Sequence, residues 1–390
     1  MKPARLLRHQ ALLPRPHPPR PRTFSTTRAA LADHVRIVEV GPRDGLQNEK
    51  TSIPLPTKLD LISRLVQTGV THIEAGSFVP AKWVPQMAST SEILESILAQ
   101  PPPAPKAVHY NYLVPNVRGL ENMIKVLQSK GKGSGGAADA YPTPPPSPHP
   151  EQESGQGPIT STEDPNAMSS EPPVQASQAN TSEISLFAAA TETFSQKNTN
   201  CGIAESMERC KPIMELARQH GIRVRGYVSV ALGCPYEGPD TDPHKVAELT
   251  ATLLEMGCDE VSVADTTGMG TAPKTRKLLQ TLKEAGILNE DLALHFHDTY
   301  GQALVNTVVG LEHGVRIFDS SVGGLGGCPY SKGATGNVAT EDLLHLLHSL
   351  GCETGIDIVK MAEIGRWITG EIGKPNDSRA GKATLARLDM

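Results

Sequence analysis

The sequence of 390 residues predicts an α/β protein whose eight parallel strands close into a (β/α)8 TIM barrel. Two observations carry this prediction. Short β-branched runs alternate eight times with stretches of helical period, and such alternation gives parallel strands with right-handed crossovers. Polar residues suited to chemistry also follow the predicted strands, where barrel enzymes carry their active sites. An open doubly wound sheet is the alternative, but no G-x-G-x-x-G follows the first strand, where a dinucleotide-binding fold has it.

Each unit begins with a short run of apolar and β-branched side chains, which is typical of a strand buried on both faces. The predicted strands are Val35–Val40, Thr71–Ala75, Ala107–Val114, Glu183–Ala188, Arg223–Val230, Glu260–Ala264, Leu292–His297 and Val315–Ser320. The predicted helices are Thr57–Thr68, Met87–Ala99, Val117–Gln128, Ser206–His220, Pro243–Met256, Pro273–Ala285, Gln302–His313 and Val338–Leu350. Glycines at helix ends support these boundaries, because glycine readily adopts the left-handed conformation that ends a helix. They are Gly69, Gly221, Gly257, Gly286, Gly314 and Gly351.

The first 32 residues do not fit the barrel pattern. They contain seven basic side chains, no acidic one, and the hydroxyl-rich run Thr23–Thr27. This composition is typical of a mitochondrial transit peptide. We therefore expect residues 1–32 to direct the protein to the mitochondrial matrix and to be removed there. A basic tail without a targeting role is the alternative.

A second stretch, residues 129–181, contains ten prolines and almost no large apolar side chains. Such a stretch cannot bury enough apolar surface to offset the entropy lost on ordering, so it predicts disorder. Strands and helices alternate on both sides of it. We therefore expect one barrel domain, residues 33–390, with a disordered insert before strand 4 and a helical extension at its C-terminus.

Charge and composition exclude several classes of function. The 37 Lys and Arg nearly balance the 42 Asp and Glu, and aromatic residues make up 4%, so no basic or base-stacking surface for nucleic acid is expected. No run of about 18 apolar residues is present, so no membrane span is expected. The six cysteines are scattered without a C-x-x-C, which favours a reducing compartment over a disulfide scaffold.

The segment Leu292–Gln302 (LALHFHDTYGQ) places two histidines at the end of a predicted strand. Because side chains alternate along a strand, His295 and His297 face the same way, while Leu294 and Phe296 face the other way. Two imidazoles on one face favour a metal site. The alternative is a pair of histidines that line the barrel and are satisfied by neighbouring polar groups.

Two oxygen-bearing side chains are candidates to complete this metal site. Asp44 lies in Gly41–Asn48 (GPRDGLQN), directly after strand 1. One carboxylate with two imidazoles leaves positions open for water or substrate, a set that suits Mg²⁺, Mn²⁺, Zn²⁺ or Fe²⁺. Asn337 precedes the last predicted helix and could be a fourth, neutral ligand. Its alternative role is to cap that helix.

Further candidates for catalysis lie near the same strand ends. Cys328 stands in the glycine-rich run Gly323–Tyr330 (GGLGGCPY), where a thiol on a flexible loop could transfer a proton. Arg43 is a fixed positive charge that could stabilise an oxyanion. Three acids complete the set, each of which could equally be a hydrogen-bond partner: Glu74, Asp265 and Glu341.

Together these motifs resemble the 3-hydroxy-3-methylglutaryl-coenzyme A (HMG-CoA) lyase family. The resemblance runs from His34 to about Gly370, outside the insert. It rests on VEVGPRDGLQNEK, SFVPAKWVPQM, RGYVSVALGCPYEG, HFHDTYGQAL and GGLGGCPYSKGATGNVATED. The motifs of strands 1 and 7 also resemble a wider group of barrel metal enzymes that includes homocitrate and isopropylmalate synthases. GLGGCPY is the mark of the lyases.

The resemblance implies a homodimeric enzyme with one Mg²⁺ or Mn²⁺ per subunit. Its substrate would be an acyl-CoA, HMG-CoA, cleaved to acetyl-CoA and acetoacetate in leucine degradation and ketone-body formation. Asp44, His295, His297 and Asn337 match the metal ligands. Arg43 matches the group that stabilises the enolate, and Cys328 matches the thiol that transfers a proton. Glu74, Asp265 and Glu341 match supporting acids, and we expect His295 or a bound water to take the hydroxyl proton.

Three rival functions remain at this stage. A synthase that condenses acetyl-CoA with a 2-oxo acid would use the same metal ligands but would lack GLGGCPY. A metal-dependent amidohydrolase would carry its H-x-H pair on strand 1. A barrel retained only for binding would have lost ligands, and none is missing from this sequence.

Overall fold

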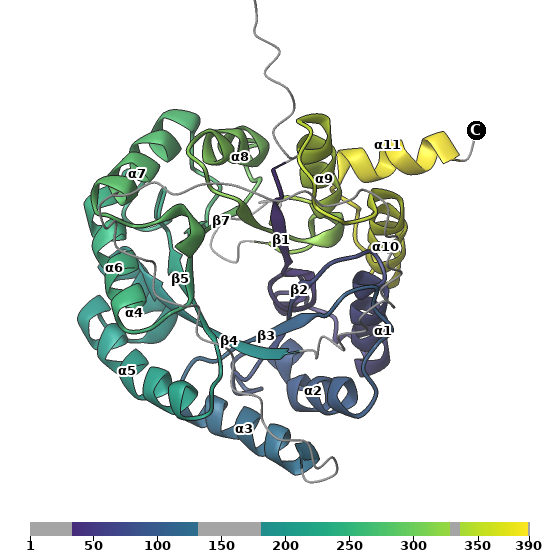
Figure 1. Cartoon of the computed structure of the whole chain (residues 1–390), viewed down its shortest axis with the longest axis horizontal. Helices are drawn as coiled ribbons and strands as arrows, with labels where there is room; N and C mark the ends of the chain where they lie inside the picture. The colour runs from purple at the N-terminus through teal and green to yellow at the C-terminus, as the bar shows by residue number, and fades with distance from the viewer. Residues whose placement is uncertain (1–32, 132–180, 328–335, 389–390) are drawn as a thin grey trace, which may run out of the picture.

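The computed structural model describes residues 33–131, 181–327 and 336–388, and in them eight strands form a closed parallel barrel (Figure 1). Each strand pairs with the next one along the chain, and β8 returns to β1 through Arg36↔Ile317 to Glu39↔Ser320, which closes the ring. The strands are β1 (Arg36–Glu39), β2 (His72–Ser77), β3 (His109–Leu113), β4 (Thr181–Ala189), β5 (Val224–Ser229), β6 (Glu260–Asp265), β7 (Leu292–Phe296) and β8 (Ile317–Ser320). The predicted TIM barrel is therefore confirmed, and the alternative of an open doubly wound sheet is wrong.

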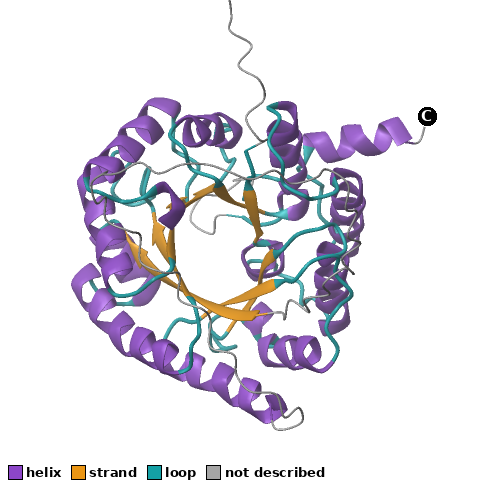
Figure 2. Ribbon diagram, viewed as in Figure 1, coloured by secondary structure: helices purple, strands orange, loops and turns teal. Residues whose placement is uncertain are grey.

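The long helices surround this ring (Figure 2). Those that follow the strands are α1 (Leu55–Val66), α2 (Thr90–Ala99), α3 (Val117–Gly131), α4 (Glu192–Thr199), α5 (Ile203–Gln219), α6 (Pro243–Glu255), α7 (Ala272–Glu284), α8 (Ala303–Glu312) and α9 (Thr340–Ser349). All eight predicted helices are present with small shifts at their ends. The short helix α4 was not predicted, because its sequence ETFSQKNT has little apolar periodicity.

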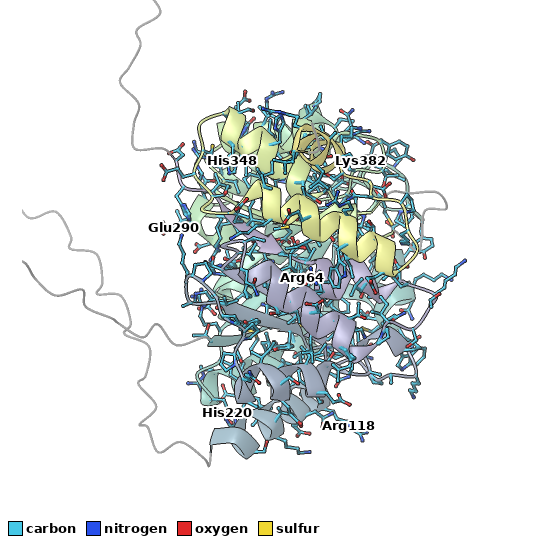
Figure 3. The ribbon with its side chains drawn as sticks, turned by 90° about the vertical axis from the view of Figure 1, so that its right-hand side faces the viewer. Arg64, Arg118, His220, Glu290, His348 and Lys382 are labelled. Carbon is cyan, nitrogen blue, oxygen red and sulfur yellow. The ribbon has the colours of Figure 1, made fainter. Side chains whose placement is uncertain are left out.

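The predicted C-terminal extension consists of α10 (Ile358–Glu371) and α11 (Arg379–Leu388). Helix α10 packs against α1, and the guanidinium of Arg64 lies 4.2 Å from the centre of the Trp367 ring. Figure 3 shows Arg64 on α1 directly below these yellow C-terminal helices. The extension therefore covers the barrel wall on the side of α1.

The two segments that do not fit the barrel pattern lie largely outside the described residues. The predicted transit peptide, residues 1–32, and most of the predicted insert, residues 132–180, belong to the parts of the chain that the structure does not describe, so both stay predictions. At the edges of the insert, α3 continues to Gly131 and β4 begins at Thr181. Among the described residues, no helix is both long and apolar enough to cross a membrane.

The six glycines predicted to end helices all have positive φ, between 62° at Gly221 and 104° at Gly257. A side chain is strained in this region because its Cβ approaches the backbone, whereas glycine is not. The helix boundaries were therefore readable from the sequence.

Side-chain alternation gives the barrel a polar interior. On β7, Leu294 and Phe296 belong to the apolar core between strands and helices, whereas Ala293 faces Ile317 and Val38 inside the ring. His295 shares the inward face with Ala293, as predicted. Most barrels of this type fill the interior with branched apolar side chains. Here the interior also buries charged and hydroxyl side chains, such as Glu74, Arg225 and Asp319, which indicates a functional interior.

Candidate active site

The turn after β1 places two of the predicted side chains. Residues Gly41–Gly45 form a π-helical turn in which Gly45 N–H donates to Val40 O at 3.1 Å. Such wide turns are rare and are found mostly at functional sites. The turn carries Arg43 and Asp44 at the carboxyl ends of the strands, and the Arg43 Nη1–H donates to Asp44 Oδ1 at 2.7 Å.

Backbone hydrogen bonds bring Asn337 to the end of β7, although 40 residues separate it from His297. Asp298 N–H donates to Gly336 O at 2.9 Å, and Val338 N–H donates to Phe296 O at 3.1 Å. These two bonds make an isolated antiparallel bridge between His297 and Asn337. The chain after β8 is therefore attached to the histidine strand at the level of the site.

Asp44, His295 and His297 form the cluster that a metal ion would need. One potential ligand atom from each lies within 4.8 Å of the other two. The two imidazole centroids are 5.2 Å apart, and both rings are buried. A carboxylate oxygen with two imidazole nitrogens fits a divalent cation that keeps positions open for other ligands.

Two buried polar atoms without partners support this fit. Within the described part of the chain, His297 Nδ1 and Asn337 Oδ1 have no hydrogen-bond partner. Buried polar atoms nearly always have a hydrogen-bond partner. Two unpaired buried atoms beside one carboxylate therefore fit a site that binds a cation. The Asn337 amide donates to Asp44 Oδ2 at 2.8 Å and to Leu325 O at 3.1 Å, which leaves its oxygen free to coordinate. It does not cap α9, whose N-cap residue is Ala339.

The ionisation states also suit a cation. Burial raises the pKa of Asp44, but the positive charge of Arg43 and the two histidines outweigh burial and hold it at about 2. Burial, helped by His295, lowers the pKa of His297 to about 4. At neutral pH the site therefore presents an ionised carboxylate and a neutral imidazole, the forms that bind metals.

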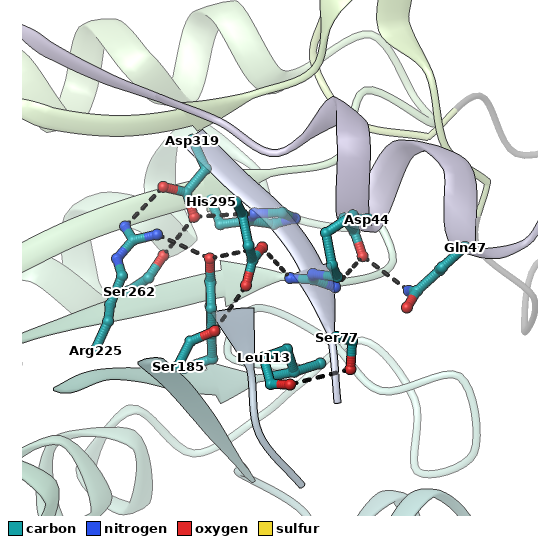
Figure 4. A network of polar contacts seen from close by, with 12 residues as sticks. Asp44, Gln47, Ser77, Leu113, Ser185, Arg225, Ser262, His295 and Asp319 are labelled. Atoms are coloured by element: carbon teal, nitrogen blue, oxygen red, sulfur yellow. Dashed lines mark hydrogen bonds and ion pairs between the residues drawn. The ribbon is translucent and has the colours of Figure 1, made fainter. Parts of the chain in front are cut away.

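His295 is oriented by Asp319, a residue that the sequence analysis did not single out. The His295 ring nitrogen Nδ1 lies 3.1 Å from Asp319 Oδ2, so its other nitrogen is the one left to face a cation (Figure 4). A carboxylate behind a ligating histidine fixes its tautomer and ring orientation. The sequence contained a signal for this role, because Asp319 is an acid within a short strand that is buried throughout.

We predict that Asp319→Asn weakens Mn²⁺ binding about 10- to 100-fold, because an amide cannot hold His295 in one tautomer as a carboxylate does. Isothermal titration with Mn²⁺ measures this directly. Asp298→Asn is the matched control, since Asp298 is half-buried and caps α8 through Ala303 N–H. Equal Mn²⁺ affinity in the Asp319 variant and the wild type would contradict the orienting role.

Arg43 joins the metal cluster to a second buried acid. Its Nη2 lies 2.5 Å from Glu74 Oε2, and Glu74 also accepts from Ser185 Oγ at 2.7 Å and Tyr227 OH at 3.3 Å. Glu74 was predicted at the end of strand 2, but β2 continues to Ser77 past an irregularity between Glu74 and Gly76. Its side chain therefore lies inside the barrel, where it holds the Arg43 guanidinium beside Asp44.

Asp265 lies at the end of β6, as predicted. Burial raises its pKa to about 6, against hydrogen bonds that include Gly270 N–H at 2.9 Å. Its other oxygen, Oδ1, has no partner in the described residues. Asp265 can therefore take or give a proton near neutral pH.

Of the two remaining predicted residues, Glu341 is described by the structure and Cys328 is not. Both carboxylate oxygens of Glu341 accept from Gly323 N–H, at 2.9 and 3.1 Å, so Glu341 holds the chain after β8 and lies outside the group formed by the three clustered residues. Cys328 lies outside the described residues. The described residue before it, Gly327, accepts from Asn48 Nδ2 at 3.0 Å.

Two buried glutamates make stability depend on pH. Burial raises the pKa of Glu39 to about 7 and that of Glu341 to about 8, despite backbone hydrogen bonds that oppose the shift. Because both folded-state values lie above the unfolded value of 4.5, the folded protein holds more protons in this range and loses stability as pH rises. Histidines whose folded pKa is lowered act the other way, but only below about pH 6.5.

We therefore predict that the melting temperature falls from about pH 6.5 to about pH 8, and that Glu341→Gln flattens this fall. Thermal unfolding followed by circular dichroism across this range measures both effects. Glu353→Gln, which removes an exposed carboxylate at the bridge to His34, is the control variant and should keep the wild-type slope. An unchanged slope in the Glu341 variant would contradict this assignment.

A closed parallel barrel with an Asp–His–His cluster at the carboxyl ends of its strands defines a class, the barrel proteins with a candidate divalent-cation site. Comparison with known proteins identifies the family within this class. The HMGL-like family model matches residues 34–129 and 167–368, so this chain belongs to the HMGL-like family. The internal stretch between the two matched segments, residues 130–166, lies within the predicted insert.

Relatives and solved structures agree with this family. A Pseudomonas aeruginosa protein named 3-hydroxy-3-isohexenylglutaryl-CoA/hydroxy-methylglutaryl-CoA lyase is 44% identical over 357 residues, covering 92% of this chain and 99% of its own. Rat mitochondrial hydroxymethylglutaryl-CoA lyase is 42% identical over 361 residues, covering 92% of each chain. The structure of hydroxymethylglutaryl-CoA lyase from Pseudomonas aeruginosa has a TM-score of 0.74 at 44% identity, covering 91% of this chain and 99% of that one.

One further structure shows what a relative binds. An HMG-CoA lyase from Acinetobacter baumannii, in complex with coenzyme A and 3-methylmalate, has a TM-score of 0.72 at 29% identity. It covers 91% of this chain and 97% of that one.

Proposed function

We propose that this protein is a divalent-metal-dependent lyase that cleaves HMG-CoA to acetyl-CoA and acetoacetate, a reaction of leucine degradation and ketone-body formation. The observation that carries the proposal is the Asp44–His295–His297 cluster beside Arg43, in a chain of the HMGL-like family. Relatives that align over nine-tenths of the chain carry the name of this activity.

The reaction breaks a carbon–carbon bond next to a tertiary alcohol. The hydroxyl loses its proton, the alcohol carbon becomes the ketone of acetoacetate, and the bonding electrons pass to the thioester fragment as an enolate. A proton on the enolate carbon then completes acetyl-CoA. A Mg²⁺ or Mn²⁺ held by Asp44, His295, His297 and Asn337 would supply Lewis acidity that lowers the pKa of this hydroxyl and orients it.

Arg43 would stabilise the negative charge that develops on the thioester oxygen. Its guanidinium is buried and is held from two sides by Asp44 and Glu74. Its Nε has no partner among the described residues and can donate to substrate. A donor fixed in place before the reaction stabilises a transition state without the cost of reorganisation.

The expected acceptor of the hydroxyl proton is His295 or a bound water, and the geometry adds Asp265 as a further candidate. His295 has one ring nitrogen directed at Asp319 and needs the other for a cation, so it has no free lone pair while it is a ligand. Asp265 has an oxygen without a partner among the described residues, and it lies on the neighbouring strand. Asp265 therefore fits the role of base better, and His295 fits the role of ligand.

Cys328 would supply the proton that completes acetyl-CoA, as the family resemblance implies. The described residues before it support a place beside the site. A Cβ on Gly326 would lie 2.7 Å from Asn337 Nδ2, so this glycine approaches the cluster closely. Full turnover by Cys328→Ser at saturating metal and substrate would refute this role.

The purified protein, given HMG-CoA and Mg²⁺, should release acetyl-CoA and acetoacetate in equal amounts. Chelation of the metal should abolish the release, and added Mn²⁺ or Mg²⁺ should restore it. Asp44→Ala is the matched catalytic control. Condensation of acetyl-CoA with a 2-oxo acid, without cleavage of HMG-CoA, would instead support the synthase alternative.

We further propose a homodimer in the mitochondrial matrix. The basic, acid-free segment 1–32 and the mitochondrial relatives support the location. Import of a fusion of residues 1–32 with a fluorescent protein tests it, with a version whose arginines are replaced by glutamine as control. Analytical ultracentrifugation of residues 33–390 tests the dimer.

A further inference from the structure

Charged side chains line the amino-terminal end of the barrel interior, opposite the candidate active site. They come from inward-facing positions near the start of several strands and include Arg36 on β1, Glu183 on β4, Arg225 on β5 and Glu260 on β6. Most of these side chains are buried or nearly so. Catalysis in such barrels belongs to the other end, so a costly set of buried charges here requires an explanation.

One ion pair in this layer connects it to the active site. Glu260 Oε1 accepts from Arg225 Nε at 2.7 Å, and the other Glu260 oxygen pairs with Arg36. Arg225 reaches upward with its two remaining nitrogens. Nη2 donates to Asp319 Oδ1 at 2.7 Å, and Nη1 donates to Tyr227 OH at 2.8 Å.

Both branches from Arg225 lead to residues of the proposed site, and Figure 4 shows the branch from Arg225 through Asp319 to His295. Asp319 holds His295 at 3.1 Å and also accepts from Ser262 Oγ at 2.9 Å. The Tyr227 hydroxyl donates to Glu74, which holds Arg43. The Arg225 fork thus contacts both the acid behind the metal ligand and the hydroxyl behind Glu74.

We propose that Glu260 is a positioning residue for the active site and acts through Arg225. Its carboxylate fixes the guanidinium plane from below, so that the two remaining nitrogens point at Asp319 and Tyr227. A planar guanidinium held by a carboxylate on one side presents its other donors in fixed directions. Without Glu260, the Arg225 guanidinium would lose this constraint and could turn away from Asp319.

Glu183 provides a matched control in the same layer. It has a similar side-chain exposure, 13% against 10% for Glu260, and it too faces an arginine. Its neighbours are Arg223, at 3.7 Å, and His109, at 3.6 Å. The hydrogen bonds of Asp319 and Tyr227 run to Arg225, Ser262, His295 and Glu74 instead. The charge of Glu183 also acts on Glu260 and Arg225. Its removal therefore perturbs the electrostatics of the layer but leaves in place the hydrogen bonds that direct Arg225 at Asp319 and Tyr227.

The first test uses the metal-free protein. Nitrogen-15 NMR of the histidine rings reports the tautomer of His295, which Asp319 should hold with the proton on Nδ1. We expect Glu260→Gln to lower the population of this tautomer, and Glu183→Gln to leave it unchanged. A His295 tautomer that is identical in the wild type and in Glu260→Gln would overturn the proposal.

The second test measures Mn²⁺ affinity, since this inference rests on the metal site of the proposed function. We expect Glu260→Gln to weaken binding about three- to tenfold and Glu183→Gln to have no effect. In the double variant with Asp319→Asn, the loss should not exceed that of Asp319→Asn alone, because both substitutions act on the same contact. Losses that multiply in the double variant would show an independent structural effect and overturn the proposal.

A second variant and an independent readout keep the role of Glu260 testable. If Glu260→Gln does not fold, Arg225→Lys keeps the positive charge but cannot reach three partners, and it should reproduce the tautomer change. If the protein does not cleave HMG-CoA, the proposed function fails while the tautomer measurement still decides the role of Glu260.

Discussion

Replacing Asp44 with alanine should lower kcat/KM for HMG-CoA at least about a thousandfold, or about 4 kcal/mol of transition-state stabilisation. The substitution removes the only carboxylate of the candidate metal cluster. It also removes the acceptor of Arg43, Gln47 and Asn337, whose donors all converge on this side chain. Steady-state release of acetoacetate measures the first effect, and Mn²⁺ titration should show binding weakened by a similar factor.

Asp60→Ala is the matched control for this variant. Asp60 is a half-exposed acid on α1 that pairs with Arg64, four residues further along the same helix. Its removal should change neither Mn²⁺ binding nor turnover, because exposed helical ion pairs contribute little. Undiminished Mn²⁺ affinity in Asp44→Ala would mean that the ion binds elsewhere.

The second large effect concerns Arg43. We expect Arg43→Gln to lower kcat about 100- to 1,000-fold, the usual cost of removing one donor that stabilises an oxyanion. Its position makes this expectation specific, since Asp44 and Glu74 hold its guanidinium in a buried site. Single-turnover kinetics with bound HMG-CoA separate the chemical step from binding.

Metal binding distinguishes this effect from that of Asp44. Arg43→Gln should still bind Mn²⁺, because the three clustered ligand residues remain. Arg64→Gln, on the α1 surface beside Trp367, should keep full turnover and serves as the control. If Arg43→Gln loses both kcat and all Mn²⁺ binding, the catalytic role is contradicted. Arg43 would then act only by holding Asp44 in place.

The fold was predictable because its signals are local. Strand and helix periods depend on neighbouring side chains, and a glycine with positive φ marks the end of six of the helices. All eight strands follow from these signals. The helix α4 and the extra length of β2 do not, since polar composition conceals the first and an irregularity of pairing after Glu74 produces the second.

The site was predictable where two residues share one strand or one turn. His295 with His297, and Arg43 with Asp44, are short-range pairs: the first share a face of one strand, and the second are neighbours in the π-helical turn after β1. Asn337 joins them through backbone bonds that no spacing rule reveals. The sequence offered Asn337 as a possible ligand from its place before the last helix, with capping of that helix as the alternative, and the family resemblance favoured the ligand.

The polar network inside the barrel could not be assembled from the sequence. Arg225, Glu260 and Asp319 lie on three different strands, and only the register of the closed ring places their side chains together. A charged residue in a buried strand signals that a partner exists. It does not identify the partner, which depends on the tertiary structure.

The central claim is that one divalent ion binds between Asp44, His295 and His297. A crystal of the protein grown with Mn²⁺ and measured for anomalous scattering tests it most directly. We predict one strong anomalous peak per chain, within coordination distance of the Asp44 carboxylate and one nitrogen of each histidine. A fully occupied peak elsewhere, with these three side chains hydrogen-bonded only to protein or water, would contradict the assignment.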